Sequence, residues 1–151
     1  MPMGSWLQIR VVLLSGRSTE LDRPPRRVMV VSSAHMLARF ANAIDLAFGR
    51  WDFAHLHAFR FDDDRMFMPG DDEPMDDVRD STRTRIVSLH LIAGDLFEYV
   101  FDMGDEWTHA CTVERVEIDP WTEWGEPLPG PVPVWGWGTI PDQYGRLGPN
   151  D

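Results

Sequence analysis

Apolar and polar residues alternate along several short stretches of this chain, which is the pattern typical of half-buried β-strands. Residues 6–14 place four aliphatic side chains on one face, Leu7, Ile9, Val11 and Leu13. Residues 26–31 predict a second strand, antiparallel to the first across a connection that contains two prolines. Residues 55–61 alternate in the same way. The first half of the chain therefore predicts several strands of one sheet.

A β-hairpin is predicted by two further stretches, 96–101 and 107–118. The loop between them contains Gly104, and we expect this glycine to take the positive φ that short hairpin loops usually require. The stretch 86–92 before the hairpin is apolar and fits either a strand or a short helical turn.

One segment has helical periodicity. Its apolar residues recur at helical spacing and are Leu37, Phe40, Ala41, Ile44, Ala47 and Phe48. Ser32 or Ser33 is the expected N-cap, and Gly49 is the expected stop signal. We expect this amphipathic helix to lay its apolar face on the sheet.

The composition changes after residue 119. Residues 120–151 hold seven prolines, six glycines and four tryptophans, which predicts an irregular arm whose tryptophans dock on the domain. The expected fold class is α+β, a mostly antiparallel sheet with one principal helix packed on it, followed by this irregular arm. The expected organisation is an α+β domain over 1–119 with the arm 120–151 docked on it, a single domain overall.

Charge narrows the classes of partner. The net charge of −11 makes duplex nucleic acid an unfavourable partner, because its phosphates favour a basic protein face. Nine acidic residues fall within 62–80, which predicts a solvated loop with a short strand at 65–68. All fourteen basic residues are arginine, whose planar guanidinium favours bidentate pairing with carboxylates.

Cys111 is the only cysteine, so an internal disulfide is excluded and a reducing compartment is expected. We expect this thiol to be buried and inert. The apolar runs are far shorter than the roughly 18 residues needed to span a bilayer. The sequence thus predicts a cytoplasmic protein that does not bind membranes. It leaves the oligomeric state and the identity of a protein partner or small ligand open.

Two motifs give the chain a family resemblance. The first, 49–59, contains Gly-Arg-Trp-Asp and His-Leu-His-Ala-Phe, and the second, 99–109, reads YVFDMGDEWTH. Over roughly 6–118 the chain resembles the plasmid pRiA4b ORF-3-like family. The resemblance implies a small α+β fold and a bacterial, plasmid or mobile-element setting, and it brings no activity with it. Two features differ from the family pattern: Pro25 precedes the paired arginines where the family has tryptophan, and a cysteine-bearing stretch of many members is replaced by 133–144.

The two motifs supply the candidate binding cluster, which is His55, His57, Asp102, Asp105, Trp107 and His109. The first two histidines are two residues apart on a predicted strand, so both side chains should leave the same face. Two imidazoles so placed can bind zinc or another first-row ion. The metal hypothesis requires the hairpin to bring the second motif beside them, and its ligands are His55, His57, Asp105 and His109. No other cofactor is predicted.

Each of these residues also has a structural interpretation. Phe59 continues the face of the two histidines, which would then be hydrogen-bonded residues of the core or its rim. Asp102 and Asp105 would cap the amides of their own loop, or pair with Arg26 or Arg27.

The sequence contains no phosphate-binding glycine loop, serine-hydrolase elbow or Cys-x-x-Cys pair. The leading hypothesis is therefore a non-enzymatic binding or accessory module, with a plasmid or mobile-element role suggested by the resemblance. One alternative is a metal-binding protein or metal-dependent hydrolase that uses the His/Asp cluster. A second is an acidic partner-binding or DNA-mimic surface on 62–80. No catalytic residue can be assigned from the sequence.

Overall fold

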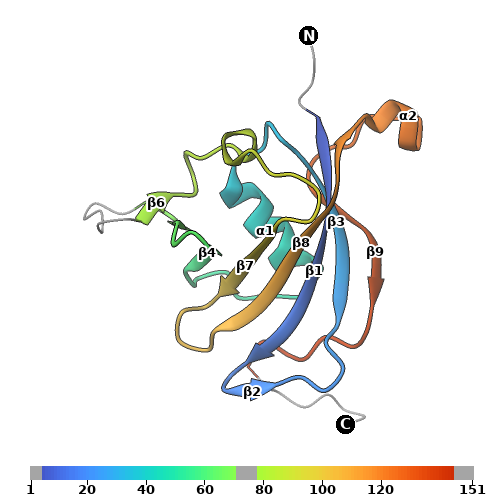
Figure 1. Ribbon diagram of the computed structural model, residues 1–151. Helices are drawn as coiled ribbons and strands as arrows, with labels where there is room; N and C mark the ends of the chain where they lie inside the picture. The colour runs from blue at the N-terminus through green and yellow to red at the C-terminus, as the bar shows by residue number, and fades with distance from the viewer. Residues whose placement is uncertain (1–4, 71–77, 145–151) are drawn as a thin grey trace.

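One sheet contains all nine strands found in the computed structural model, which describes residues 5–70 and 78–144. The strand order is β6-β5-β4-β7-β8-β1-β3-β9, and the short β2 pairs with the end of β1. The strands are β1 (Trp6–Gly16), β2 (Thr19–Glu20), β3 (Arg26–Ser32), β4 (His57–Phe61), β5 (Met66–Met68), β6 (Val78–Asp80), β7 (Leu96–Phe101), β8 (Trp107–Ile118) and β9 (Val132–Trp137). The sheet curves around a single long helix, α1 (Leu37–Ala47) (Figure 1).

The centre of the sheet follows the predicted alternation. The four aliphatic residues of β1, Leu7, Ile9, Val11 and Leu13, are all buried in the main core. β1 pairs antiparallel with β3 on one side and with β8 on the other. β1 is therefore an interior strand of the sheet, with one face turned to the helix.

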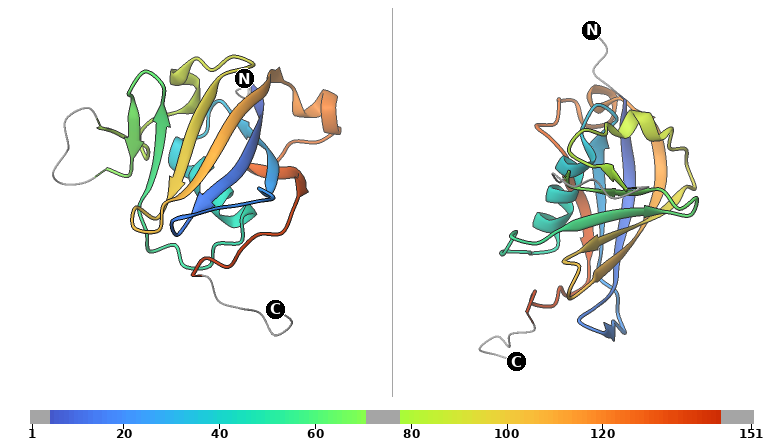
Figure 2. Two further views of the ribbon diagram at one scale, coloured as in Figure 1. Left: turned by 60° about the horizontal axis from the view of Figure 1, so that its bottom comes forward. Right: turned by 90° about the vertical axis from the view of Figure 1, so that its left-hand side faces the viewer.

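Helix α1 packs on the concave face of the sheet (Figure 2). The ring of Phe40 stacks on that of Phe59 from β4, with 5.9 Å between the ring centroids. The predicted serine caps were wrong, because Met36 is the N-cap and its side chain makes no capping bond. The first amides of the helix instead donate to backbone carbonyls of a distant loop, Leu37 to Thr84 and Ala38 to Ser81.

The stretch after that loop forms the 3₁₀-helix η1 (Ile86–Leu89), which settles the ambiguity of the apolar segment 86–92. The predicted hairpin of β7 and β8 is confirmed, with Tyr99 opposite His109. The glycine prediction in its loop was wrong. Positive φ falls on Asp102 and Glu106, and Gly104 is not among the positive-φ glycines of the described residues. Aspartate tolerates this conformation when its side chain bonds the amides that follow.

The predicted fold class was wrong. The molecule is dominated by one large mixed sheet, because β5 and β6 run parallel while the other neighbouring strands are antiparallel. The C-terminal arm is not irregular throughout, since it contributes the short helix α2 (Pro120–Trp124) and the edge strand β9. An edge strand tolerates a proline such as Pro133, because one side of the strand needs no sheet partner.

The arm tryptophans do not dock as expected. Trp121, Trp135 and Trp137 are 58%, 52% and 47% exposed. Trp124 packs on the body, together with Leu128, against a small apolar cluster formed by Trp6, Val30 and Ile118.

Part of the predicted acidic loop, 71–77, lies outside the described residues, as does the end of the arm, 145–151. The predicted short strand in that loop is confirmed as β5. In the two described ranges, no helix has the length and apolar character needed to cross a membrane.

Candidate functional site

The hairpin loop of the second motif is built around Asp102. Its carboxylate accepts the amides of Gly104 and Asp105, at 2.9 and 3.2 Å. Asp105 pairs with Arg17, at 3.4 Å, and not with Arg26 or Arg27. Those two arginines instead contact the arm: Arg26 lies over the Trp137 ring, and Arg27 donates to the Trp137 carbonyl.

His55 lies between two carboxylates at the surface. Its Nδ1 is 3.5 Å from Asp102 Oδ2, and its Nε2 is 3.5 Å from Asp52 Oδ2. The Tyr144 hydroxyl donates to Asp52 at 2.5 Å and therefore accepts a hydrogen bond from His55 Nε2 at 2.6 Å. The hydrogen bond to Asp52 raises the pKa of Tyr144 to about 12 and lowers that of Asp52. We call these four residues, Asp52, His55, Asp102 and Tyr144, the His55 cluster.

Gln143 fixes the arm beside this cluster. Its side-chain oxygen accepts the amides of Trp51 and Asp52, and its side-chain amide donates to the Asp52 carbonyl at 2.8 Å. Its backbone carbonyl accepts the indole N–H of Trp107 at 3.2 Å. Gln143 is buried despite being polar, and these three hydrogen bonds to the backbone compensate its side chain for lost hydration.

A network of buried polar residues lies inside the protein, and it includes His109, Arg50, Tyr99 and Asp45. His109 Nδ1 is 2.9 Å from the Tyr99 carbonyl, which can only accept, so the proton is on Nδ1. His109 Nε2 then accepts from Arg50 Nη2 at 3.0 Å. The Arg50 guanidinium lies over the rings of Phe48, Phe101 and Trp107. Its Nη1 is buried without a hydrogen-bond partner in the described structure.

Burial shifts the pKa values of this network. It lowers the pKa of Arg50 to about 10, and it lowers that of His109 with help from the Arg50 charge. Asp45 accepts the Tyr99 hydroxyl at 2.8 and 2.9 Å, yet burial raises the pKa of Asp45 to about 7. The network joins helix α1, the segment after it and the β7–β8 hairpin through groups that stay inside the protein.

The two histidines of the first motif do not share surroundings. β4 begins at His57, so His55 lies before the strand. His57 contacts the Ser81 hydroxyl at 2.9 Å and the rings of Phe59 and Tyr99, and burial lowers its pKa to about 4. Among the described residues, no group of three or more His, Cys, Asp or Glu side chains gathers as a metal site. Cys111 is buried, which raises its pKa.

Sequence reasoning missed the most connected residues of this region: Asp45, Arg50, Asp52, Gln143 and Tyr144. Asp45 and Arg50 carry the clearest signal, since each is a charged residue within or next to the apolar stripe of the predicted helix. The last two lie in the arm, where composition gives no sign of a specific contact.

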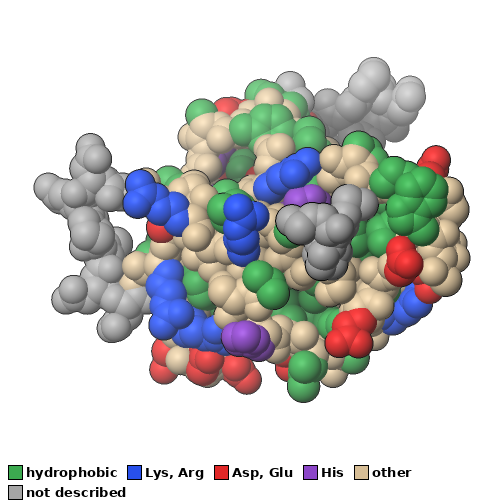
Figure 3. Space-filling model, turned by 90° about the horizontal axis from the view of Figure 1, so that it is seen from above, with side chains coloured by type: hydrophobic (Ala, Val, Ile, Leu, Met, Phe, Trp, Pro, Cys, Tyr) green, Lys and Arg blue, Asp and Glu red, His purple; other side chains and the backbone are tan. Residues whose placement is uncertain are grey.

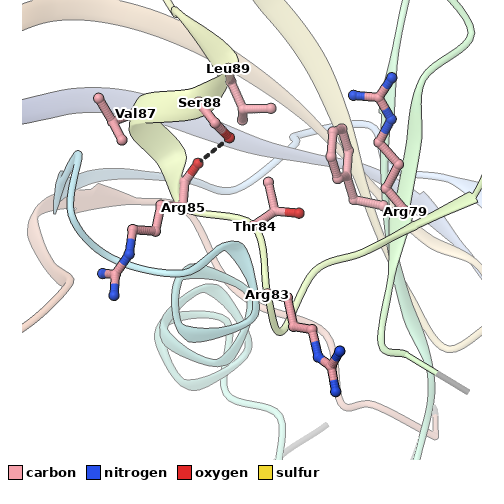
Figure 4. Close-up of a pocket in the computed structure, with 8 residues that line it drawn as sticks. Arg79, Arg83, Thr84, Arg85, Val87, Ser88 and Leu89 are labelled. Atoms are coloured by element: carbon pink, nitrogen blue, oxygen red, sulfur yellow. Dashed lines mark hydrogen bonds between the residues drawn. The ribbon is translucent and has the colours of Figure 1, made fainter.

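A second site was not predicted at all. Three arginines, Arg79, Arg83 and Arg85, line a surface cavity of about 410 Å³ (Figure 4). The rest of its lining is Phe67, Thr84, Val87, Ser88 and Leu89. Figure 3 shows the molecule from above, and most of the arginine side chains visible in this view gather on its left half. We call this cavity the arginine pocket.

The loop that forms the pocket is held by Asp80. Its carboxylate accepts the amides of Gly70 and Thr82 and the Thr82 hydroxyl. The same loop caps α1, because the carbonyls of Ser81 and Thr84 accept the first amides of the helix. The Thr84 and Ser88 hydroxyls donate to the carbonyls of Asp80 and Arg85, which leaves guanidinium groups as the side-chain donors of the pocket.

The fold and its sites thus define a small mixed-sheet protein with an inward-facing polar network and an arginine-lined surface cavity. The plasmid pRiA4b ORF-3-like family model matches residues 7–127, and the chain belongs to this family. The chain is 33% identical over 90 residues to "Uncharacterized protein y4hQ" of Sinorhizobium fredii. That alignment covers 59% of this chain and 45% of y4hQ, so the chain spans under half the length of this curated relative.

A crystal structure from Methanosarcina mazei Go1, a protein of unknown function named MM3350, has a similar fold. The TM-score is 0.68 at 14% sequence identity, over 89% of this chain and 70% of the other. At this identity the likeness concerns the fold alone.

Proposed function

We propose that this protein is a non-enzymatic binding module whose ligand carries anionic groups recognised by the arginine pocket. The observation that carries the proposal is the gathering of Arg79, Arg83 and Arg85 around one cavity in a chain of net charge −11. Like charges brought together at the surface repel one another, and an anionic ligand relieves that repulsion. Guanidinium groups are also the donors that pair best with carboxylates and phosphates.

The contacts of the sequence-predicted residues support binding over catalysis. Asp102 caps its own loop, Asp105 pairs with Arg17, and both ring nitrogens of His109 bond within the core. These groups stabilise the scaffold that holds the pocket. We extend the proposal to an accessory role in plasmid or mobile-element functions, which is supported by the family to which the chain belongs.

The test is isothermal titration calorimetry with inorganic pyrophosphate. This small anion presents phosphate groups without any other part of a ligand, so it tests recognition of the anionic groups alone. We expect pyrophosphate to bind, and an Arg79→Ala/Arg83→Ala double variant to bind about tenfold more weakly or worse, because two of the three positive charges around the cavity are removed.

Arg10→Ala is the matched control, since Arg10 pairs with Glu114 on the sheet and does not line the pocket. This variant removes the same kind of charge and should bind like the wild type. Absence of binding, or an equal loss in the Arg10 variant, would contradict the proposal.

A further inference from the structure

We infer that the natural ligand of the arginine pocket is an extended acidic peptide segment of a partner protein, with anionic side chains spaced along it. This inference rests on the proposed function and names its ligand class.

The arrangement of the arginines argues for separated charges. Figure 4 shows the guanidinium groups of Arg79, Arg83 and Arg85 pointing in different directions from the rim of the pocket. The Arg83 side chain is 87% exposed and pairs with Asp80 at 3.5 Å, and Arg85 donates to the Ala34 carbonyl at 2.6 Å. A single small anion cannot contact three diverging groups at once. Anionic side chains at intervals along an extended backbone can.

The rest of the pocket matches a peptide. Val87 is an exposed apolar side chain in the lining, whereas Leu89, which also lines the pocket, is buried. The Thr84 and Ser88 hydroxyls donate their hydrogen bonds to backbone carbonyls, so toward a ligand their oxygens can act only as acceptors. A matching ligand therefore carries negative charge for the arginines, an apolar side chain for Val87 and N–H donors for the hydroxyl oxygens. An acidic peptide has all three.

The same features disfavour nucleic acid. Phe67, the only aromatic residue in the described lining, is 1% exposed and is covered by the Arg79 guanidinium, with 5.9 Å to the ring centroid. It therefore offers no face for base stacking, on which single-stranded nucleic acid recognition relies. The net charge of −11 also opposes a long polyanion, whereas a short acidic segment needs only a local basic site.

The test uses fluorescence anisotropy with four labelled eight-residue or eight-nucleotide probes. These are a peptide with two glutamates, the same peptide with two phosphoserines, the same peptide with two glutamines, and oligothymidine. We expect both anionic peptides to bind and the glutamine peptide to fail. The two anionic peptides report whether carboxylates or phosphoryl groups are preferred.

Arg79→Gln and Arg83→Gln should each weaken the glutamate or phosphoserine peptide roughly fivefold, as expected for exposed ion pairs, and Arg10→Gln should not. Thermal unfolding of each variant separates loss of contact from loss of fold. Oligothymidine binding as tightly as the better peptide, or peptide binding that is insensitive to both pocket variants, would overturn the inference. Pyrophosphate binding without peptide binding would overturn the peptide ligand and leave the proposed function intact. Failure of all the probes and of pyrophosphate would overturn both.

Discussion

Asp45 and Arg50 are ionisable groups inside the protein, and they do not form a direct ion pair in the described structure. Each is stabilised by neighbours of another kind: the Tyr99 hydroxyl bonds Asp45, and aromatic rings with His109 surround Arg50. Buried charges are costly unless such contacts compensate for lost hydration. The titration of Asp45 should therefore be visible in the stability of the protein.

Asp45→Asn tests this point. Burial raises the pKa of Asp45 from its ordinary value of 3.8 to about 7, so the folded protein holds an extra proton between these pH values. Its contribution to stability is present below the unfolded pKa and falls as pH rises toward the folded pKa. The free energy of unfolding of the wild type should thus decline relative to Asp45→Asn across this window, by as much as about 4 kcal/mol. Urea unfolding at a series of pH values measures it.

The comparison with the variant is needed because His57 and His109 change the free energy of unfolding with pH in the opposite direction to Asp45. Their pKa values are lowered on folding, so they favour the folded state as pH rises. Both proteins share that contribution, and the difference isolates Asp45. Parallel pH profiles would contradict the assignment.

Individual residues show what sequence can predict. The capping of loop amides by Asp102 was one of the predicted alternatives, because that role depends only on residues two and three positions away. The partners of Arg50 could not be predicted, because His109 is 59 residues away and faces Arg50 only once the sheet has formed.

Secondary-structure elements show the same contrast: features that depend on nearby residues could be predicted, and features that depend on distant segments could not. The strands with clear alternation and the helix were predicted, since their patterns lie within each segment. The cap of α1 and the parallel pairing of β5 and β6 were not, because both depend on segments far away or on the register between strands.

At the scale of elements, Gln143 links the arm to the segment after α1. We expect Gln143→Ala to lower the free energy of unfolding by about 1–3 kcal/mol, because the amides of Trp51 and Asp52 lose their acceptor. Urea unfolding measures the loss. Trp121→Ala is the control, since this side chain is more than half exposed and its removal should change stability by less than about 0.5 kcal/mol. Equal stability of the two variants would argue against the anchoring role of Gln143.

At the scale of the whole molecule, a basic cavity lies on an acidic protein. Screening by salt weakens attraction between the pocket and an anion, and it also weakens repulsion between that anion and the rest of the chain. The short-range attraction dominates for a small ligand. We therefore expect the affinity for pyrophosphate to fall several-fold between about 50 and 500 mM salt, measured by titration. An affinity that rises with salt would show that the overall negative charge dominates.

The arm strand β9 has one further consequence, which concerns how the protein behaves at high concentration. β9 covers the edge of β3, whose Val28, Met29, Val30 and Val31 would otherwise present an open, strongly apolar strand. Such edges recruit strands of other molecules and start aggregation. β9 itself carries Pro133 and an irregular register against β3, features that discourage further strand addition. The proline-rich arm thus covers the edge of β3 and presents in its place an outer edge that is a poorer template for strand addition.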